Sequence, residues 1–315
     1  MRSCEKKFFC AKLTENFLKG FDEMHFTTGI NRPPYEKDSG FLQVTSGCSH
    51  KKCTLCGYFK DCGFNFSPID EIAEDIKEIP KYFGKPKRIF LQSADAFAAS
   101  YDILMKTAEL IHKYVPSVKT IGGYARIDNF IDKTENQLRE MKNIGYFNPY
   151  IGVESGDNEI LKKVHKGYDS KTAREQLEKL TSAGMSIIAN FLNGLGGKNF
   201  GLNHAKKTAK LYEKIKISMI EVSSLTLVSE TNLFYQKQRG KFFEATEIER
   251  LEEMQEFLRD LTNETTFLSN HISMPFFVRA KLPEEREKLI EGIQKIIEEV
   301  GEEKLRRHRE ENPIM

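Results

Sequence analysis

The sequence predicts an α/β protein in which six strand–helix units form a partial barrel, followed by a helical C-terminal extension. Three observations lead to this prediction. Short runs rich in β-branched and aromatic residues alternate with longer segments of helical periodicity, and a Gly-rich or polar segment follows each strand. The C-terminal part changes to charged, amphipathic patterns. Six units between residues 41 and 227 suit a parallel, TIM-like partial barrel, a partial (β/α)6 barrel, better than a doubly wound sheet.

The individual elements follow from local patterns. In the first helix the isoleucines recur on one face, and Ser67-Pro68 supplies a cap and a first turn. Gly145 and Gly184 are typical of positions that end a helix. The predicted strands are 41–45, 88–91, 118–124, 150–153, 186–192 and 218–227, and the predicted helices are 69–83, 101–114, 136–143, 170–183 and 203–215.

The changes in pattern along the chain predict three segments. Residues 1–38 form an N-terminal extension, 39–235 the core domain, and 236–315 a helical C-terminal segment. The last segment contains two charged amphipathic helices, at 247–261 and 284–300, and a tail that we expect to be solvated charge.

Composition excludes several classes of protein. Lysine and arginine number 48 against 46 acidic residues, so the net charge of +2 does not indicate binding to nucleic acid. The mean hydropathy is −0.49 and no run of 18 apolar residues occurs, so we expect no membrane span. The first residues show no secretory pattern, and we therefore expect a cytoplasmic protein.

The cysteines are concentrated near the N-terminus. Cys48, Cys53 and Cys56 follow the first predicted strand directly. Three thiolates that converge on a [4Fe–4S] cube leave one iron open, and an open iron can bind a substrate. The alternatives are a zinc site with His50 or Cys62 as fourth ligand, in a zinc-stabilised binding module, and a generic barrel enzyme whose cysteines are incidental. The spacing of Cys4, Cys10 and Cys62 matches no pattern for a second cluster.

Three motifs in the same order resemble the radical S-adenosylmethionine (SAM) superfamily. The cysteine loop has the spacing Cys-x4-Cys-x2-Cys, one residue longer than the common Cys-x3-Cys-x2-Cys, with Leu55 where an aromatic residue is usual. The segment 151–156, Ile-Gly-Val-Glu-Ser-Gly, is similar to the fourth-strand motif of the subgroup that contains Elongator-protein-3-like proteins and methylthiotransferases. The segment 189–196 resembles the fifth-strand segment that lies along the adenine in that family.

This resemblance implies an enzyme with two cofactors, a [4Fe–4S] cluster and SAM. Cys48, Cys53 and Cys56 would bind three of the irons. The cluster would cleave SAM reductively into methionine and a 5′-deoxyadenosyl radical, which abstracts hydrogen from the substrate. A flavodoxin or ferredoxin-type protein would supply the electron. The protein orients the cofactor and excludes water.

Candidate SAM contacts follow the second and third strands. Asp95 and the backbone around Ser93 stand where the family has a Gly-Gly-Glu-Pro-like turn, and the alternative for Asp95 is a helix N-cap. Arg126 follows the third strand and would pair with the cofactor carboxylate as a fork, or else form a structural salt bridge.

Further candidates lie on later strands and in the cysteine loop. Glu154 would contact the cofactor or Arg126, or else form an internal ion pair. Asn190 would bind the ribose or be a satisfied core amide, and Tyr58 would lie by the adenine or merely pack in its loop.

The substrate is only broadly indicated. His271, between the two C-terminal helices, is a weak candidate for a catalytic residue, and a capped helix–helix connection is the alternative. Lys162, Lys163 and Lys166 with Lys171 form a basic stretch, which a solvated helix face explains at least as well as a large polymeric substrate does. The chain shows neither the RNA-binding appendage of methylthiotransferases nor an N-terminal cobalamin-binding domain. We therefore expect a small molecule or a peptide as substrate.

Overall fold

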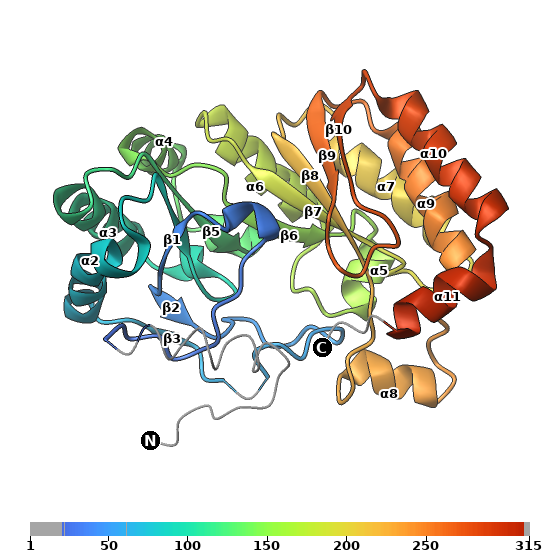
Figure 1. The fold of residues 1–315 in the computed structure, drawn as a ribbon, viewed down its shortest axis with the longest axis horizontal. Helices are drawn as coiled ribbons and strands as arrows, with labels where there is room; N and C mark the ends of the chain where they lie inside the picture. The colour runs from blue at the N-terminus through green and yellow to red at the C-terminus, as the bar shows by residue number, and fades with distance from the viewer. Residues whose placement is uncertain (1–20, 22, 61, 312–315) are drawn as a thin grey trace.

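One curved sheet of eight strands organises the molecule. A computed structural model describes residues 21, 23–60 and 62–311. The strand order is β1-β4-β5-β6-β7-β8-β9-β10, and a separate two-stranded ribbon, β2 with β3, flanks it (Figure 1). The strands are β1 (Gly40–Leu42), β2 (Thr45–Ser46), β3 (Asn65–Phe66), β4 (Arg88–Leu91), β5 (Thr120–Ala125), β6 (Tyr150–Glu154), β7 (Ile188–Asn193), β8 (Met219–Ser224), β9 (Thr265–Ser269) and β10 (Val278–Leu282).

The helices cover the outer side of this sheet. In Figure 1, α2 to α4 stand beside the first strands, whereas α7, α9 and α10 stand beside the last ones. The helices are α2 (Ile69–Phe83), α3 (Tyr101–Tyr114), α4 (Glu135–Ile144), α5 (Asn158–Lys163), α6 (Ser170–Ser182), α7 (Gly201–Tyr212), α8 (Asn232–Gln238), α9 (Glu247–Asp260), α10 (Arg286–Glu299) and α11 (Glu302–Glu311), with short 3-10 turns η1 (Pro34–Glu36), η2 (Ala96–Ala98) and η3 (Ile127–Phe130). Within the described residues, no helix is both long and apolar enough to cross a bilayer.

The predicted α/β fold is confirmed. The strands β1, β4, β5, β6, β7 and β8 pair in parallel, in the order in which the sequence supplies them. A parallel strand needs a crossover connection, and the predicted helices between the strands provide it. The carboxyl ends of these strands therefore share one edge of the sheet, as in a partial barrel.

The C-terminal segment differs in part from the prediction. It is largely helical, but it also supplies two strands: β9 pairs in parallel with β8, and β10 runs antiparallel to β9. The segment 267–273, predicted as a helix–helix connection, therefore begins inside β9. The tail predicted as solvated charge forms α11, which buries Leu305. The segment boundaries at 38 and 235 stay predictions, and the pairing of β8 with β9 joins the sheet across the second.

The two faces of the sheet have different partners. On β7, Phe191 stacks on Phe257 of α9 with ring centroids 4.3 Å apart, so its face packs on the helices. Side chains alternate along a strand. Asn190 consequently lies on the opposite, inner face, where its register partner on β8 is Glu221.

We predict that Phe257→Ala lowers the free energy of unfolding by about 3–5 kcal/mol, because it opens a cavity between α9 and β7. Phe243→Ala is the control, since Phe243 is 65% exposed, and we expect a loss below about 1 kcal/mol. Urea unfolding measures both values. Equal losses in the two variants would contradict this account of the core.

Candidate functional site at the carboxyl edge of the sheet

The cysteine loop is closed by a small ribbon and is anchored at both ends. It runs from β2 to β3, which pair antiparallel. Gly47 begins it with φ of 73°, and a Cβ there would lie 2.4 Å from the carbonyl oxygen of Gly63, so only glycine fits. Cys48, Cys53 and Cys56 all carry free thiols. Between the last two, the Thr54 N–H donates to the Val164 carbonyl at 3.0 Å, and the Thr54 carbonyl accepts from the Leu233 N–H at 2.9 Å.

The loop after β4 holds the first half of the cysteine loop. The Ser93 hydroxyl donates to the carbonyl oxygen of Gly47 at 2.8 Å. The buried Asp95 carboxylate accepts the Ser49 N–H at 3.2 Å and also the Ser49 hydroxyl. Asp95 stands at the N-cap position of η2, as the alternative expected, but its side chain makes no capping hydrogen bond there. Ser93 and Asp95 therefore fix the residues on either side of Cys48, and their predicted contacts with SAM stay predictions.

Arg126 lies next to the cysteines but not beside Glu154. Its Nε and Nη2 atoms form a fork on Asp128, at 2.9 and 2.8 Å, and Nη2 also donates to the Lys166 carbonyl at 2.8 Å. Its Nη1 lies 3.9 Å from Cys53 Sγ. The structural salt bridge that the sequence left open is thus present, and it points the guanidinium at a thiol.

Glu154 pairs with a lysine that the sequence placed in solvent. The Glu154 Oε1 atom lies 3.0 Å from Lys166 Nζ, and Lys166 is buried, so its expected place on a solvated helix face is wrong. Although burial opposes its charged form, the Glu154 carboxylate raises the pKa of Lys166. The internal ion pair expected as the alternative for Glu154 is therefore present.

Two residues at this edge hold unusual backbone angles. Ser93 follows β4 with φ of 82°, and Glu154 ends β6 with φ of 68°. Left-handed angles are costly for residues other than glycine, and they persist where the surroundings demand them, often at functional sites.

Tyr58 and His271 are the next two candidates from the sequence. Tyr58 is exposed, with its ring 5.1 Å from that of Phe59. His271 lies between β9 and β10, where its Nδ1 atom is 2.7 Å from the Ser273 hydroxyl. That hydroxyl accepts the Ser224 N–H at 2.8 Å, so the turn fastens to the end of β8.

Asn190 is largely satisfied by protein groups. Its Nδ2 donates to the Tyr150 hydroxyl at 2.9 Å and the Ser223 hydroxyl at 3.2 Å. Its Oδ1 atom is buried and has no partner in the described part of the chain. A ribose contact for Asn190 stays a prediction.

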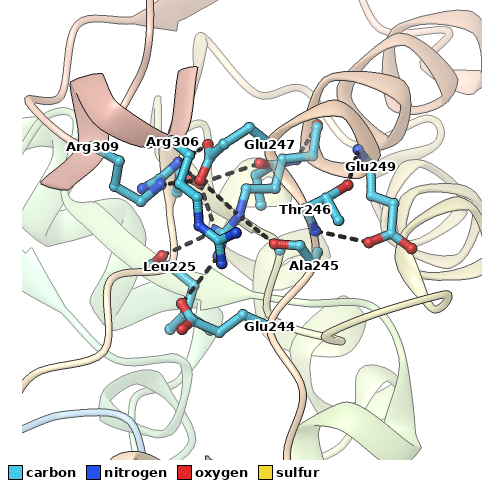
Figure 2. Close-up of polar contacts among 12 residues, drawn as sticks. Leu225, Glu244, Ala245, Thr246, Glu247, Glu249, Arg306 and Arg309 are labelled. Carbon is cyan, nitrogen blue, oxygen red and sulfur yellow. Dashed lines mark hydrogen bonds and ion pairs between the residues drawn. The ribbon is translucent and has the colours of Figure 1, made fainter. Parts of the chain in front are cut away.

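A buried ionic network attaches the C-terminal helices beyond the end of β8. Arg250 of α9 donates to the Ser224 hydroxyl at 2.8 Å and to the Leu225 carbonyl at 2.9 Å. Arg309 of α11 pairs with Glu247 of α9 (Figure 2). The helices α9 and α11 therefore support the same edge of the sheet that carries the site.

Glu221 is the residue that the sequence analysis missed. It is buried on the inner face of β8, and burial raises its pKa to about 7, partly offset by hydrogen bonds from Tyr35 and Tyr150. A glutamate between Ile220 and Val222, inside an otherwise apolar strand, was the available signal.

The described part of the cysteine loop does not form a site for a single metal ion. In residues 21, 23–60 and 62–311, no three His, Cys, Asp or Glu side chains converge as ligands of one ion. A cubane binds each thiolate at a separate iron, so its ligands stand further apart. The His50 Nε2 atom lies 2.6 Å from the His165 carbonyl oxygen, so this nitrogen is already engaged. The zinc alternative thus finds no support, and Cys4 and Cys10 lie outside the described residues.

A protein family model matches the part of the chain that carries the three cysteines. The model of the family described as "Radical SAM superfamily" matches residues 42–212, which is more than half of the chain. The chain belongs to the radical SAM superfamily. As a member, it is an enzyme whose cofactors are a [4Fe–4S] cluster and SAM.

Solved structures share the fold at low identity. The radical SAM methyltransferase TsrM from Kitasatospora setae matches with a TM-score of 0.52 and 12% identity, over 64% of this chain and 39% of its own. Elp3 from the archaeon Methanocaldococcus infernus matches with 0.50 and 16%, over 84% and 64%. HydG, a maturase of the [FeFe]-hydrogenase, matches with 0.51 and 16%, over 80% and 54%. The chain covers less than two thirds of each of these structures. A comparison with curated proteins found no match.

We predict that Asp95→Ala releases Ser49 and Cys48, because both hydrogen bonds on Ser49 are lost. In cluster-free protein, iodoacetamide should then alkylate Cys48 several-fold faster, as measured by peptide mass spectrometry. Asp260→Ala, at an exposed position, is the control. An unchanged rate at Cys48 would show that Asp95 does not position the loop.

We also predict that Lys166→Met lowers the free energy of unfolding by about 3 kcal/mol, since it leaves the Glu154 carboxylate without its partner. Adding Glu154→Gln should recover more than half of that loss. Lys163→Met, at an exposed position of α5, serves as control. Additive losses in the double variant would refute the coupling of the two side chains.

Proposed function

We propose that Cys48, Cys53 and Cys56 bind three irons of the cluster, and that the protein uses the 5′-deoxyadenosyl radical to take hydrogen from a small-molecule or peptide substrate. The observation that carries this proposal is the set of three free thiols held beside Arg126 and Lys166 at the carboxyl edge of the sheet. When bound, the cluster passes one electron to the SAM sulfonium, which splits into methionine and the radical.

The residues around the cysteines supply position and charge. Ser93 and Asp95 hold Cys48, and the Thr54 backbone holds the turn from Cys53 to Cys56. Arg126 lies beside Cys53 and would offset the negative charge of its thiolate, because opposite charges at short range favour the ionised form. Burial raises the pKa of the Cys56 thiol, and the charge of Lys166 partly opposes this effect. Glu154, the end residue of β6, is suited to accept hydrogen bonds from the amino group or the ribose of SAM.

The electron donor is proposed from the surface of the loop. Lys51 and Lys52 are exposed between Cys48 and Cys53, and Lys60 is exposed after Cys56. Positive charge beside the cluster favours an acidic partner. This supports a flavodoxin or ferredoxin-type protein as donor, and a cytoplasmic location stays a prediction.

We predict that Cys53→Ser abolishes cluster binding, because one iron loses its thiolate. After anaerobic reconstitution, iron and sulfide should fall well below the four of each in the wild type. Dithionite-driven release of 5′-deoxyadenosine should fall at least about tenfold, given that loss of a ligand's supporting partner alone commonly costs about 10–100-fold.

Cys62→Ser is the matched control for this experiment. A [4Fe–4S] cluster on the three-cysteine loop predicts unchanged iron, sulfide and 5′-deoxyadenosine release in this variant. Zinc in place of iron and sulfide, or loss of metal on substitution of Cys62, would overturn the proposal.

A further inference from the structure

Glu221 is a buried carboxylate without a basic partner. It is 3% exposed, its Oε2 atom accepts the Tyr35 hydroxyl at 3.2 Å, and the Tyr150 hydroxyl also hydrogen-bonds to it. No lysine, arginine or histidine among the described residues forms an ion pair with it. A buried charge normally has a counter-charge, because transfer from water to the interior is costly.

The other buried carboxylates have a basic side chain nearby, which Glu221 lacks. One of them, Asp95, binds Ser49 and lies near Arg126. Each of the rest has a basic side chain within ion-pair distance: Glu36 with Arg88, Asp75 with His25, Asp157 with Lys207, Glu247 with Arg309, and Glu253 with His204. Glu221 thus stands apart from every other buried acid that the structure describes.

A second acceptor without a partner lies beside Glu221. Asn190 is its register partner on β7 and is 3% exposed. The Asn190 Nδ2 atom donates to the Tyr150 hydroxyl and, at 3.4 Å, to the Glu221 carbonyl. Because a carbonyl can only accept, this contact fixes the orientation of the amide, and Oδ1 is left buried and unpaired.

Aromatic rings border these two acceptors. Tyr124 and Tyr150 meet edge to face with centroids 5.2 Å apart, and Phe90 contacts Tyr124 at 5.0 Å. Tyr124 and Tyr150 are only half-buried. Ring faces attract cations.

The place of Glu221 and Asn190 in the sheet also suits the binding of a substrate. Glu221 is the third of six residues in β8 and Asn190 is the third of six in β7, so both lie on the strands below their carboxyl ends. Glu154 belongs to the carboxyl edge of the sheet, where the cysteine loop lies. The acceptors therefore line the inner face of the sheet below that edge.

We propose that Glu221 and Asn190, with Tyr35 and Tyr150, form a subsite for a primary ammonium group of the substrate. An ammonium group has three donors and a positive charge, so it satisfies both acceptors and supplies the missing counter-charge. A neutral hydroxyl would leave the carboxylate uncompensated. This proposal rests on the proposed function, since it names the chemistry of the molecule from which hydrogen is taken.

The test measures binding of n-butylammonium, with n-butanol as the neutral match, to the anaerobically reconstituted protein with SAM. Calorimetry should show butylammonium binding at least about tenfold more tightly than butanol. Glu221→Gln should remove this preference, whereas Glu252→Gln, at an exposed position of α9, should keep it. Equal affinity for the two probes in the wild type, or an intact preference in Glu221→Gln, would overturn the proposal.

The pH dependence of binding gives a readout that a structural role would not change. An ammonium group needs the ionised carboxylate, so its affinity should rise about tenfold per pH unit up to about pH 7 and then level off. The groups that face Glu221 are the hydroxyls of Tyr35 and Tyr150, with Tyr124 beside them, and the amide of Asn190. Burial raises the pKa of Tyr35 and of Tyr150 well above that of a free tyrosine, so neither titrates in this range. A flat profile in the wild type would contradict the subsite.

A second variant and a second measurement separate failure of the ammonium subsite from misfolding and from failure of the proposed function. Should Glu221→Gln fail to fold, Tyr35→Phe is the second variant: it removes one hydrogen bond to the carboxylate, so butylammonium should bind several-fold more weakly at pH 6. No change in Tyr35→Phe would count against the proposal. Iron, sulfide and SAM cleavage are measured on the same wild-type sample, so that failure of the proposed function appears there and failure of the ammonium subsite appears only in the binding.

Discussion

The attachment of the cysteine loop to the loop after β4 is the constraint on which the rest of the site depends. Cys48 follows a strand of two residues, which cannot hold a thiol in place by itself. The Gly47 carbonyl and the Ser49 N–H are instead fixed by Ser93 and Asp95. Because β4 lies between β1 and β5 in the sheet, these bonds give the loop the rigidity of the barrel. The left-handed backbone at Ser93 is the local cost of turning its hydroxyl toward that carbonyl.

Buried charge explains why the later strands contribute to the same site. Arg126 and Lys166 are buried cations, and each has its own acid, Asp128 or Glu154. The Lys166 carbonyl also accepts from Arg126, so the two pairs form one unit beside Cys53. Removing one member of such a unit leaves an uncompensated charge, which costs more than the pair itself contributes. The segments that follow β5 and α5 thus place two linked ion pairs beside Cys53.

The sequence predicted the parts of this molecule that depend on local periodicity. The helix 69–83 and the strand 88–91 have the predicted bounds, because amphipathic spacing and short apolar runs determine them. The strands β9 and β10 were missed, since each has only five residues between charged helices. They form by pairing with distant partners, β9 with β8 and β10 with β9. In the site, cysteine spacing identified the thiols. The burial of Lys166 and the roles of Ser93 and Asp95 depend on contacts between distant segments, which no local pattern encodes.

The buried carboxylates on the two sides of the sheet differ in their partners. On the outer side and beyond the strand ends, pairs such as Glu253 with His204 and Glu247 with Arg309 join helices to the sheet. On the inner side, Glu221 has only hydroxyl partners and Asn190 retains an unpaired oxygen. An uncompensated carboxylate lowers the stability of a fold, and it is tolerated where the surroundings supply the missing free energy. The unpaired Asn190 oxygen and the missing counter-charge of Glu221 are therefore best explained by what the inner face binds, because packing alone supplies neither.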